Sequence, residues 1–180
     1  MNDLEQLLSG GDLRSIGENN KVVLAIHNQD EFDELFRMIC SPNRVIAMRA
    51  IDAVEKITIS RPAYLSKYST DILELLEKAE HKEIKWHLAL LIPRLRLEQN
   101  ELRQAWHMLV NWVECASNSR IVRVNALQSL YQITLAQPHY KKGLMHIITR
   151  LETENIPSIS ARIRKIKDHV LNGSSILFVF

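Results

Sequence analysis

Basic and amide side chains recur along this chain at intervals of 37 or 38 residues, and such groups are well suited to binding anions. One set consists of Arg49, His87, Asn125 and Arg162. A second set, seven positions further on, consists of Lys56, Arg94, Gln132 and His169. Lysine and arginine both bind carboxylates and phosphates, and arginine offers a fork of parallel donors. Neither set contains an acid, so together they predict a surface that binds carboxylate or phosphate groups.

A third set, three positions after the first, mixes an acid and an apolar residue with polar ones: Asp52, Leu90, Gln128 and Lys165. Trp86 and Leu90 lie outside the regular apolar positions of their segment. An aromatic anchor ringed by basic groups is typical of a peptide-binding or helix-binding site, whereas burial at the centre of the molecule is the alternative. The alternative for the polar positions is a lining that binds no ligand. We predict a binding groove formed by Arg49, Lys56, Trp86, His87, Leu90, Arg94, Asn125, Gln132, Arg162, Lys165 and His169.

The segments that carry these side chains have the periodicity of amphipathic helices. Apolar residues follow each segment's first residue about four, seven or eight, and eleven positions later, which places them on one helical face. The first residues are Ile46, Ile84, Val122 and Ile159, at steps of 38, 38 and 37. Another apolar stripe of helical spacing precedes each segment, and Ser41-Pro42 predicts an N-cap followed by proline at the first helical position. A near-constant step of this size indicates an array of helix pairs.

The third segment carries a resemblance to a known family. Its run Val122-Arg123-Val124-Asn125-Ala126-Leu127 resembles the second helix of HEAT repeats. The other segments depart from this pattern in two ways: Ala47 and Ser160 occupy its usual basic position, and Pro93 interrupts the second segment. The resemblance implies an all-α, right-handed α-α superhelix whose second helices line the concave side. The chain also resembles, more distantly, the HEAT-like DNA alkylation repair proteins, without a match to their catalytic site. We expect one domain over 1–172, with a helical cap at 1–29, four helix pairs at 30–60, 62–97, 100–136 and 138–172, and an apolar tail at 173–180.

Composition limits the possible functions. The chain has 180 residues and a formal net charge of +2, but residues 1–40 carry −5 and residues 118–180 carry +6. Such asymmetry favours end-to-end self-association or an anionic partner. Cys40 and Cys115 have no disulfide or metal spacing, and the sequence contains no phosphate-binding loop or nucleophile motif. The acidic beginning does not resemble a targeting signal, and no run of residues is apolar enough to span a membrane, so we expect a cytoplasmic protein.

These observations favour a non-enzymatic scaffold or adaptor that binds an acidic protein segment in its groove and needs no metal or cofactor. Binding to a nucleic-acid backbone through the same cations is the alternative function. Self-association through the oppositely charged ends, or through the apolar tail Ile176–Phe180, is a further possibility. The tail could equally fold back over the last helix pair, because terminal repeats need covering.

Overall fold

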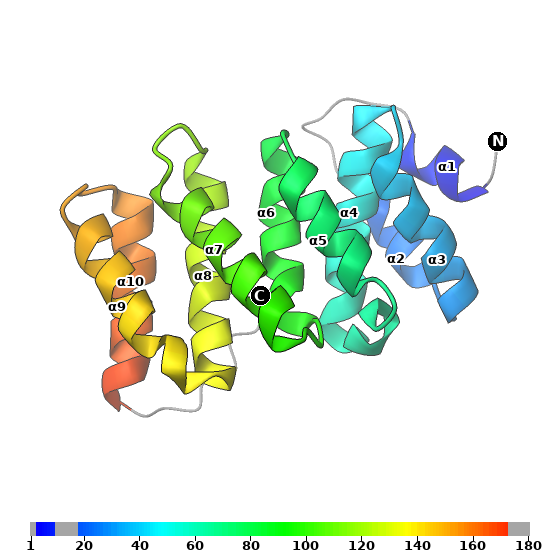
Figure 1. The fold of residues 1–180 in the computed structure, drawn as a ribbon. Helices are drawn as coiled ribbons and strands as arrows, with labels where there is room; N and C mark the ends of the chain where they lie inside the picture. The colour runs from blue at the N-terminus through cyan, green and yellow to red at the C-terminus, as the bar shows by residue number, and fades with distance from the viewer. Residues whose placement is uncertain (1–2, 10–17, 173–180) are drawn as a thin grey trace.

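The protein is built from helices stacked in two layers (Figure 1). The computed structural model describes residues 3–9 and 18–172, with side chains as far as residue 169. Over these residues the chain forms ten α-helices and no strand. The predicted all-α solenoid is therefore confirmed.

Four helix pairs follow one another along the array. They are α3 (Gln29–Arg37) with α4 (Arg44–Ser60), α5 (Ser69–Lys78) with α6 (Lys82–Leu91), α7 (Gln99–Glu114) with α8 (Arg120–Ala136), and α9 (Lys141–Glu152) with α10 (Pro157–Asn172). Two short helices, α1 (Asp3–Leu8) and α2 (Asn19–Ala25), precede them. In Figure 1 the first helix of each pair lies in the front layer, and the second helices lie behind, all beginning at the upper edge of the view. The second helices are therefore parallel to one another.

Local sequence determines where the helices begin and end. The side chain of Asn43, and not Ser41, caps α4 by accepting a hydrogen bond from the Val45 amide at 3.0 Å. The predicted Ser41 cap is therefore wrong, and Pro42 lies in the turn before the helix. Proline lacks an amide donor and disturbs a helix interior, so α6 ends at Leu91 and Pro93 lies in a 3-10 turn, Ile92–Arg94. Similar turns occupy Met38–Cys40, Pro62–Leu65 and Pro138–Tyr140.

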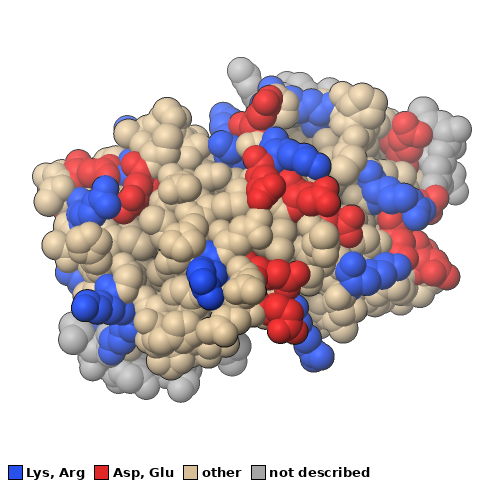
Figure 2. Space-filling view, in the orientation of Figure 1, with Lys and Arg blue, Asp and Glu red and all other residues tan. Residues whose placement is uncertain are grey.

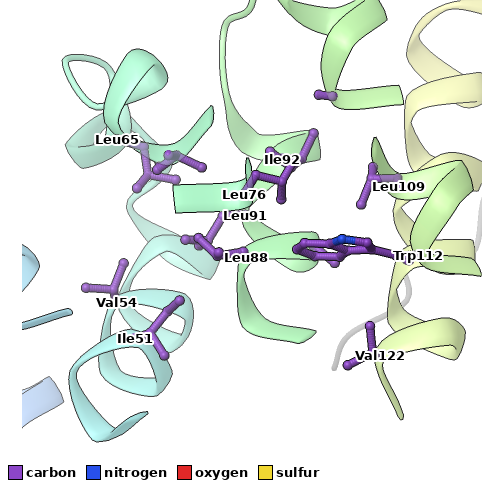
Figure 3. Close-up of a cluster of buried hydrophobic side chains, with 14 of the residues drawn as sticks. Ile51, Val54, Leu65, Leu76, Leu88, Leu91, Ile92, Leu109, Trp112 and Val122 are labelled. Carbon is purple, nitrogen blue, oxygen red and sulfur yellow. The ribbon is translucent and has the colours of Figure 1, made fainter. Parts of the chain in front are cut away.

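Equivalent apolar residues of successive repeats share one core. Ile46, Val122 and Ile159 are at most 4% exposed, and Ile84 is partly buried. Figure 3 shows side chains of α4, α5, α6, α7 and α8 converging in one continuous cluster. The repeats therefore stack as neighbours, and this stacking determines which polar side chains of adjacent helices face one another.

No helix within the described ranges is long and apolar enough to cross a membrane. The predicted apolar tail at 173–180 lies outside the described residues.

Candidate functional site

Arg49, predicted to line a groove, is buried with 1% of its surface exposed. Its Nη1 donates hydrogen bonds to the carbonyl oxygens of Leu8 and Ser9, at 2.9 and 2.8 Å. These carbonyls end α1, where a helix leaves carbonyl groups without intrahelical partners. Arg49 therefore fixes the first helix to α4, and its prediction as a groove cation is wrong.

His87 is also buried, with 5% exposure, and it lies among charged groups of neighbouring elements. Its Nε2 is 3.8 Å from Asp52 Oδ1, and its Nδ1 is 4.0 Å from Glu55 Oε2. The pKa of the imidazole is lowered to about 4, chiefly by burial; Asp52 opposes this shift, and Lys56 and Arg94 add to it. His87 is therefore neutral at neutral pH, and it contributes no positive charge to a binding surface.

The remaining predicted cations of α4 and its neighbour are paired internally. Lys56 Nζ lies 2.7 Å from Asp52 Oδ2, and the amide of Asn19 on α2 donates to the same carboxylate. Arg94 donates to the Glu55 carbonyl oxygen at 2.5 Å and forms an ion pair with the Glu55 carboxylate. These bonds join α2 to α4 and α4 to the turn that follows α6.

The same pattern continues toward the C-terminus. Arg162 donates to Gln128 Oε1 at 2.6 Å, and burial lowers the pKa of its guanidinium. His169 Nδ1 forms a hydrogen bond with the Tyr131 hydroxyl. Ser129 Oγ donates to the carbonyl oxygen of Ala89 at 2.6 Å, which joins α8 to α6. Asn125 and Gln132 are partly buried, and Lys165 is exposed.

Four of the nine predicted polar side chains, those of His87, Arg94, Arg162 and His169, therefore face the neighbouring second helix instead of solvent. Helical geometry gives the reason. With 3.6 residues per turn, positions three and ten past each segment's first residue lie about 80–100° from the middle of the buried face. That direction points toward the adjacent second helix. Positions two, six and thirteen lie about 140–180° away and face outward in most repeats, although Gln128, at position six of the third repeat, is 2% exposed.

These outward positions are rich in apolar residues. Ile59 and Leu135 occupy the thirteenth position of their repeats and are 50% and 55% exposed. Trp86 and Leu90, which were predicted for the groove, do lie on this side of α6, both partly buried. We call the set the second-helix surface: Met48, Ile59, Trp86, Leu90, Ile121, Val124 and Leu135.

A cationic row that the sequence reasoning missed borders this surface. Arg44, Lys82 and Arg120 are the first residues of α4, α6 and α8, they are 38 positions apart, and all three are exposed. Arg44 lies 2.8 Å from Glu83 Oε2; although burial raises the pKa of Glu83, this hydrogen bond lowers it below its ordinary value. We call Arg44, Lys82 and Arg120 the cationic edge. The 38-residue step between the first residues of the helices was the signal in the sequence that could have identified it. It lies at the upper margin in Figure 1.

The first-helix layer presents a different surface. Figure 2 shows acidic and basic side chains intermixed over α3 and α5, and the coloured residues form no continuous field of one sign on this face. No group of three metal-binding side chains occurs among the described residues. The cationic edge and the second-helix surface are thus the more organised features of the described chain.

Comparison with known families identifies the architecture. A family model described as HEAT repeat domain matches residues 2–170. The chain belongs to the HEAT-repeat family. HEAT repeats commonly mediate protein interactions and are typically non-enzymatic scaffolds. No curated protein and no solved structure matches the chain, and the distant likeness to DNA alkylation repair proteins is not shown.

Arg123, which belongs to the run that resembles the second helix of HEAT repeats, has a structural role. Arg123 is 2% exposed; its Nε donates to the Val113 carbonyl oxygen at 2.6 Å, and its Nη2 lies 2.7 Å from both carboxylate oxygens of Glu154. It therefore ties α8 to α7 and to the turn after α9.

Proposed function

We propose that this HEAT-repeat protein is a scaffold that binds a partner protein on its second-helix surface. The observation that carries the proposal is the presence of exposed apolar side chains at the same position of the first and third repeats, Ile59 and Leu135. Exposed apolar groups that line up across several elements are characteristic of interaction sites, whereas singly scattered ones are ordinary. Extended surfaces of this kind are what stacked repeats provide.

The predicted acidic character of the partner is retained, but different cations support it. Arg49, His87, Arg94 and Arg162 are engaged within the fold, whereas Arg44, Lys82 and Arg120 are exposed at the cationic edge. Their spacing matches the repeat, so an acidic segment running along the array meets one cation in each of the first three repeats, of which Arg44 also pairs with Glu83. Electrostatic complementarity of this kind increases the association rate and specificity.

Substitution of the exposed apolar residues tests the proposal. The double variant Ile59→Glu with Leu135→Glu places charges on the second-helix surface without disturbing the core. Proteins copurified with the wild type from the cells that make it are quantified by mass spectrometry, and we expect the double variant to lose at least one partner by about tenfold.

Met145 supplies the control, because it is an exposed apolar residue, at 36%, on α9, the first helix of the fourth pair. Met145→Glu is expected to retain the partner. Equal retention by both variants refutes the proposal. Capture of nucleic acid in place of protein, with an affinity that falls steeply with salt, would support the alternative function.

A further inference from the structure

A hollow of about 460 Å³ opens between the first turns of α6 and α8, where the second-helix surface meets the cationic edge. It is lined by Lys82, Glu83, Trp86, Ser119, Arg120 and Ile121. Its volume falls within the roughly 300–1,000 Å³ range of ligand pockets. The hollow thus combines an indole and an exposed aliphatic side chain with two cations.

The charge of the hollow is positive in balance. Lys82 and Arg120 lie on its rim, and Glu83 is its one acid. Glu83 is held by Arg44 at 2.8 Å, whereas its oxygen lies 3.9 Å from Lys82. No carboxylate of the described residues forms an ion pair with Arg120. An anionic group entering the hollow therefore meets a cation that the fold has left available.

Two of the residues that line the hollow each have a polar atom without a hydrogen-bond partner. Trp86 Nε1 and Ser119 Oγ are both buried and unpaired among the described residues. Ser119 is the N-cap residue of α8, yet its side chain makes no capping hydrogen bond. A buried polar group left unpaired is costly to a fold. The N-terminus of α8 adds a partial positive charge.

We propose that this hollow binds an apolar side chain of the partner together with an adjacent carboxylate. The apolar side chain lies against Trp86 and Ile121, and the carboxylate pairs with Arg120 or Lys82. The inference rests on the proposed function and specifies its chemistry: the partner segment is acidic, with a large apolar residue within a few positions of an Asp or Glu. A basic or purely polar segment does not complement the hollow.

Selection from a random library of 12-residue peptides displayed on phage tests the inference, with the full chain as the target. We expect enriched peptides to combine Leu, Phe or Met with Asp or Glu. Binding of the synthetic peptides, measured by fluorescence anisotropy, should weaken by about tenfold or more with Arg120→Glu and with Ile121→Ser. Because both residues are exposed, these variants are expected to fold, which circular dichroism checks. Lys142→Glu, an exposed charge reversal on α9, is the matched control and should bind as the wild type does.

The outcomes separate this inference from the proposed function. Enriched peptides that are basic or uncharged overturn the inference. Peptides that keep their affinity with Arg120→Glu and Ile121→Ser, but lose it with Ile59→Glu and Leu135→Glu, also overturn it and leave the proposed surface intact. Failure to enrich any peptide, or enrichment lost with none of these variants, counts against both. Preferential binding of a 12-nucleotide single strand over the peptides overturns both as well.

Discussion

The buried imidazole of His87 predicts a specific acid sensitivity of the fold. Its pKa is about 4 in the folded protein, against an ordinary 6.5, chiefly because burial penalises the charged form. Above pH 6.5 the ring is neutral in both states and contributes no pH dependence. Between pH 6.5 and 4 the unfolded chain binds a proton that the folded protein excludes. The free energy of unfolding therefore decreases as the pH is lowered through this range.

The size of the effect follows from the two pKa values. One pKa unit corresponds to about 1.4 kcal/mol, so the full loss at pH 4 is roughly 3 kcal/mol, and at pH 5 it is roughly 2 kcal/mol. The groups that face the ring are Asp52, Glu55 and Lys56 from α4, and Arg94 from the turn after α6. Carboxylates whose pKa is lowered, such as Asp33 at about 2, lose their contribution only at lower pH.

Urea unfolding followed by circular dichroism between pH 7.5 and 5 measures this dependence. His87→Gln and His87→Leu cannot titrate, so both should lose about 2 kcal/mol less than the wild type over this range, whatever their stabilities at pH 7.5. Two variants are needed because polar and apolar replacements pack differently, and agreement between their pH slopes isolates the titration. Parallel curves for wild type and variants would refute the reasoning.

Three further predictions concern stability and use the same urea assay. Arg49→Glu should lower the free energy of unfolding by about 3 kcal/mol or more, because it places an acid against the Leu8 and Ser9 carbonyl oxygens. Arg44→Glu, at an exposed position, should change the free energy of unfolding by under about 1 kcal/mol. Equal effects of the two substitutions would contradict the burial of Arg49. Arg123→Ala should lower the free energy of unfolding by about 2–4 kcal/mol, because Arg123 is buried and donates to the Val113 carbonyl oxygen. Glu154→Ala should lower it by about 1 kcal/mol or less, because the Glu154 side chain is one-third exposed. A larger effect of Glu154→Ala than of Arg123→Ala would be inconsistent with these hydrogen bonds. Gly143→Ala should stabilise α9 by about 0.5–1 kcal/mol, since the added Cβ meets Trp106 Cζ2 at an ordinary 3.4 Å; a loss of stability would show that the contact is too close.

The fold was predictable because one chemical regularity repeats. A buried apolar set at a step of 38 residues determines the register of all four second helices, and Ile46, Val122 and Ile159 occupy equivalent environments. Local boundaries depended on finer competition. Ser41 and Asn43 are both good caps, and the amide side chain of Asn43 is the one that accepts the hydrogen bond from Val45.

The candidate site was less predictable, because helical spacing gives the direction of a side chain but not what lies there. Arg49 points where expected relative to Ile46, yet α1 covers it, and no periodicity places α1. His87 and Arg94 point toward the preceding second helix, α4, whose acidic side chains contact them. Arg120 was identifiable from the repeat step, but only once the helix starts, rather than the apolar residues, were compared.

The hydrogen bonds between neighbouring helices of the rear layer have a consequence for how the array can be altered. The contact is amide to carboxylate between α2 and α4, guanidinium to carboxylate between α4 and the turn after α6, hydroxyl to backbone carbonyl between α8 and α6, and guanidinium to amide between α10 and α8. Each of these contacts is thus chemically different from the others. Duplicating, deleting or exchanging a unit replaces the matched pairs at the new junction, so the units are not interchangeable even though their backbones are alike.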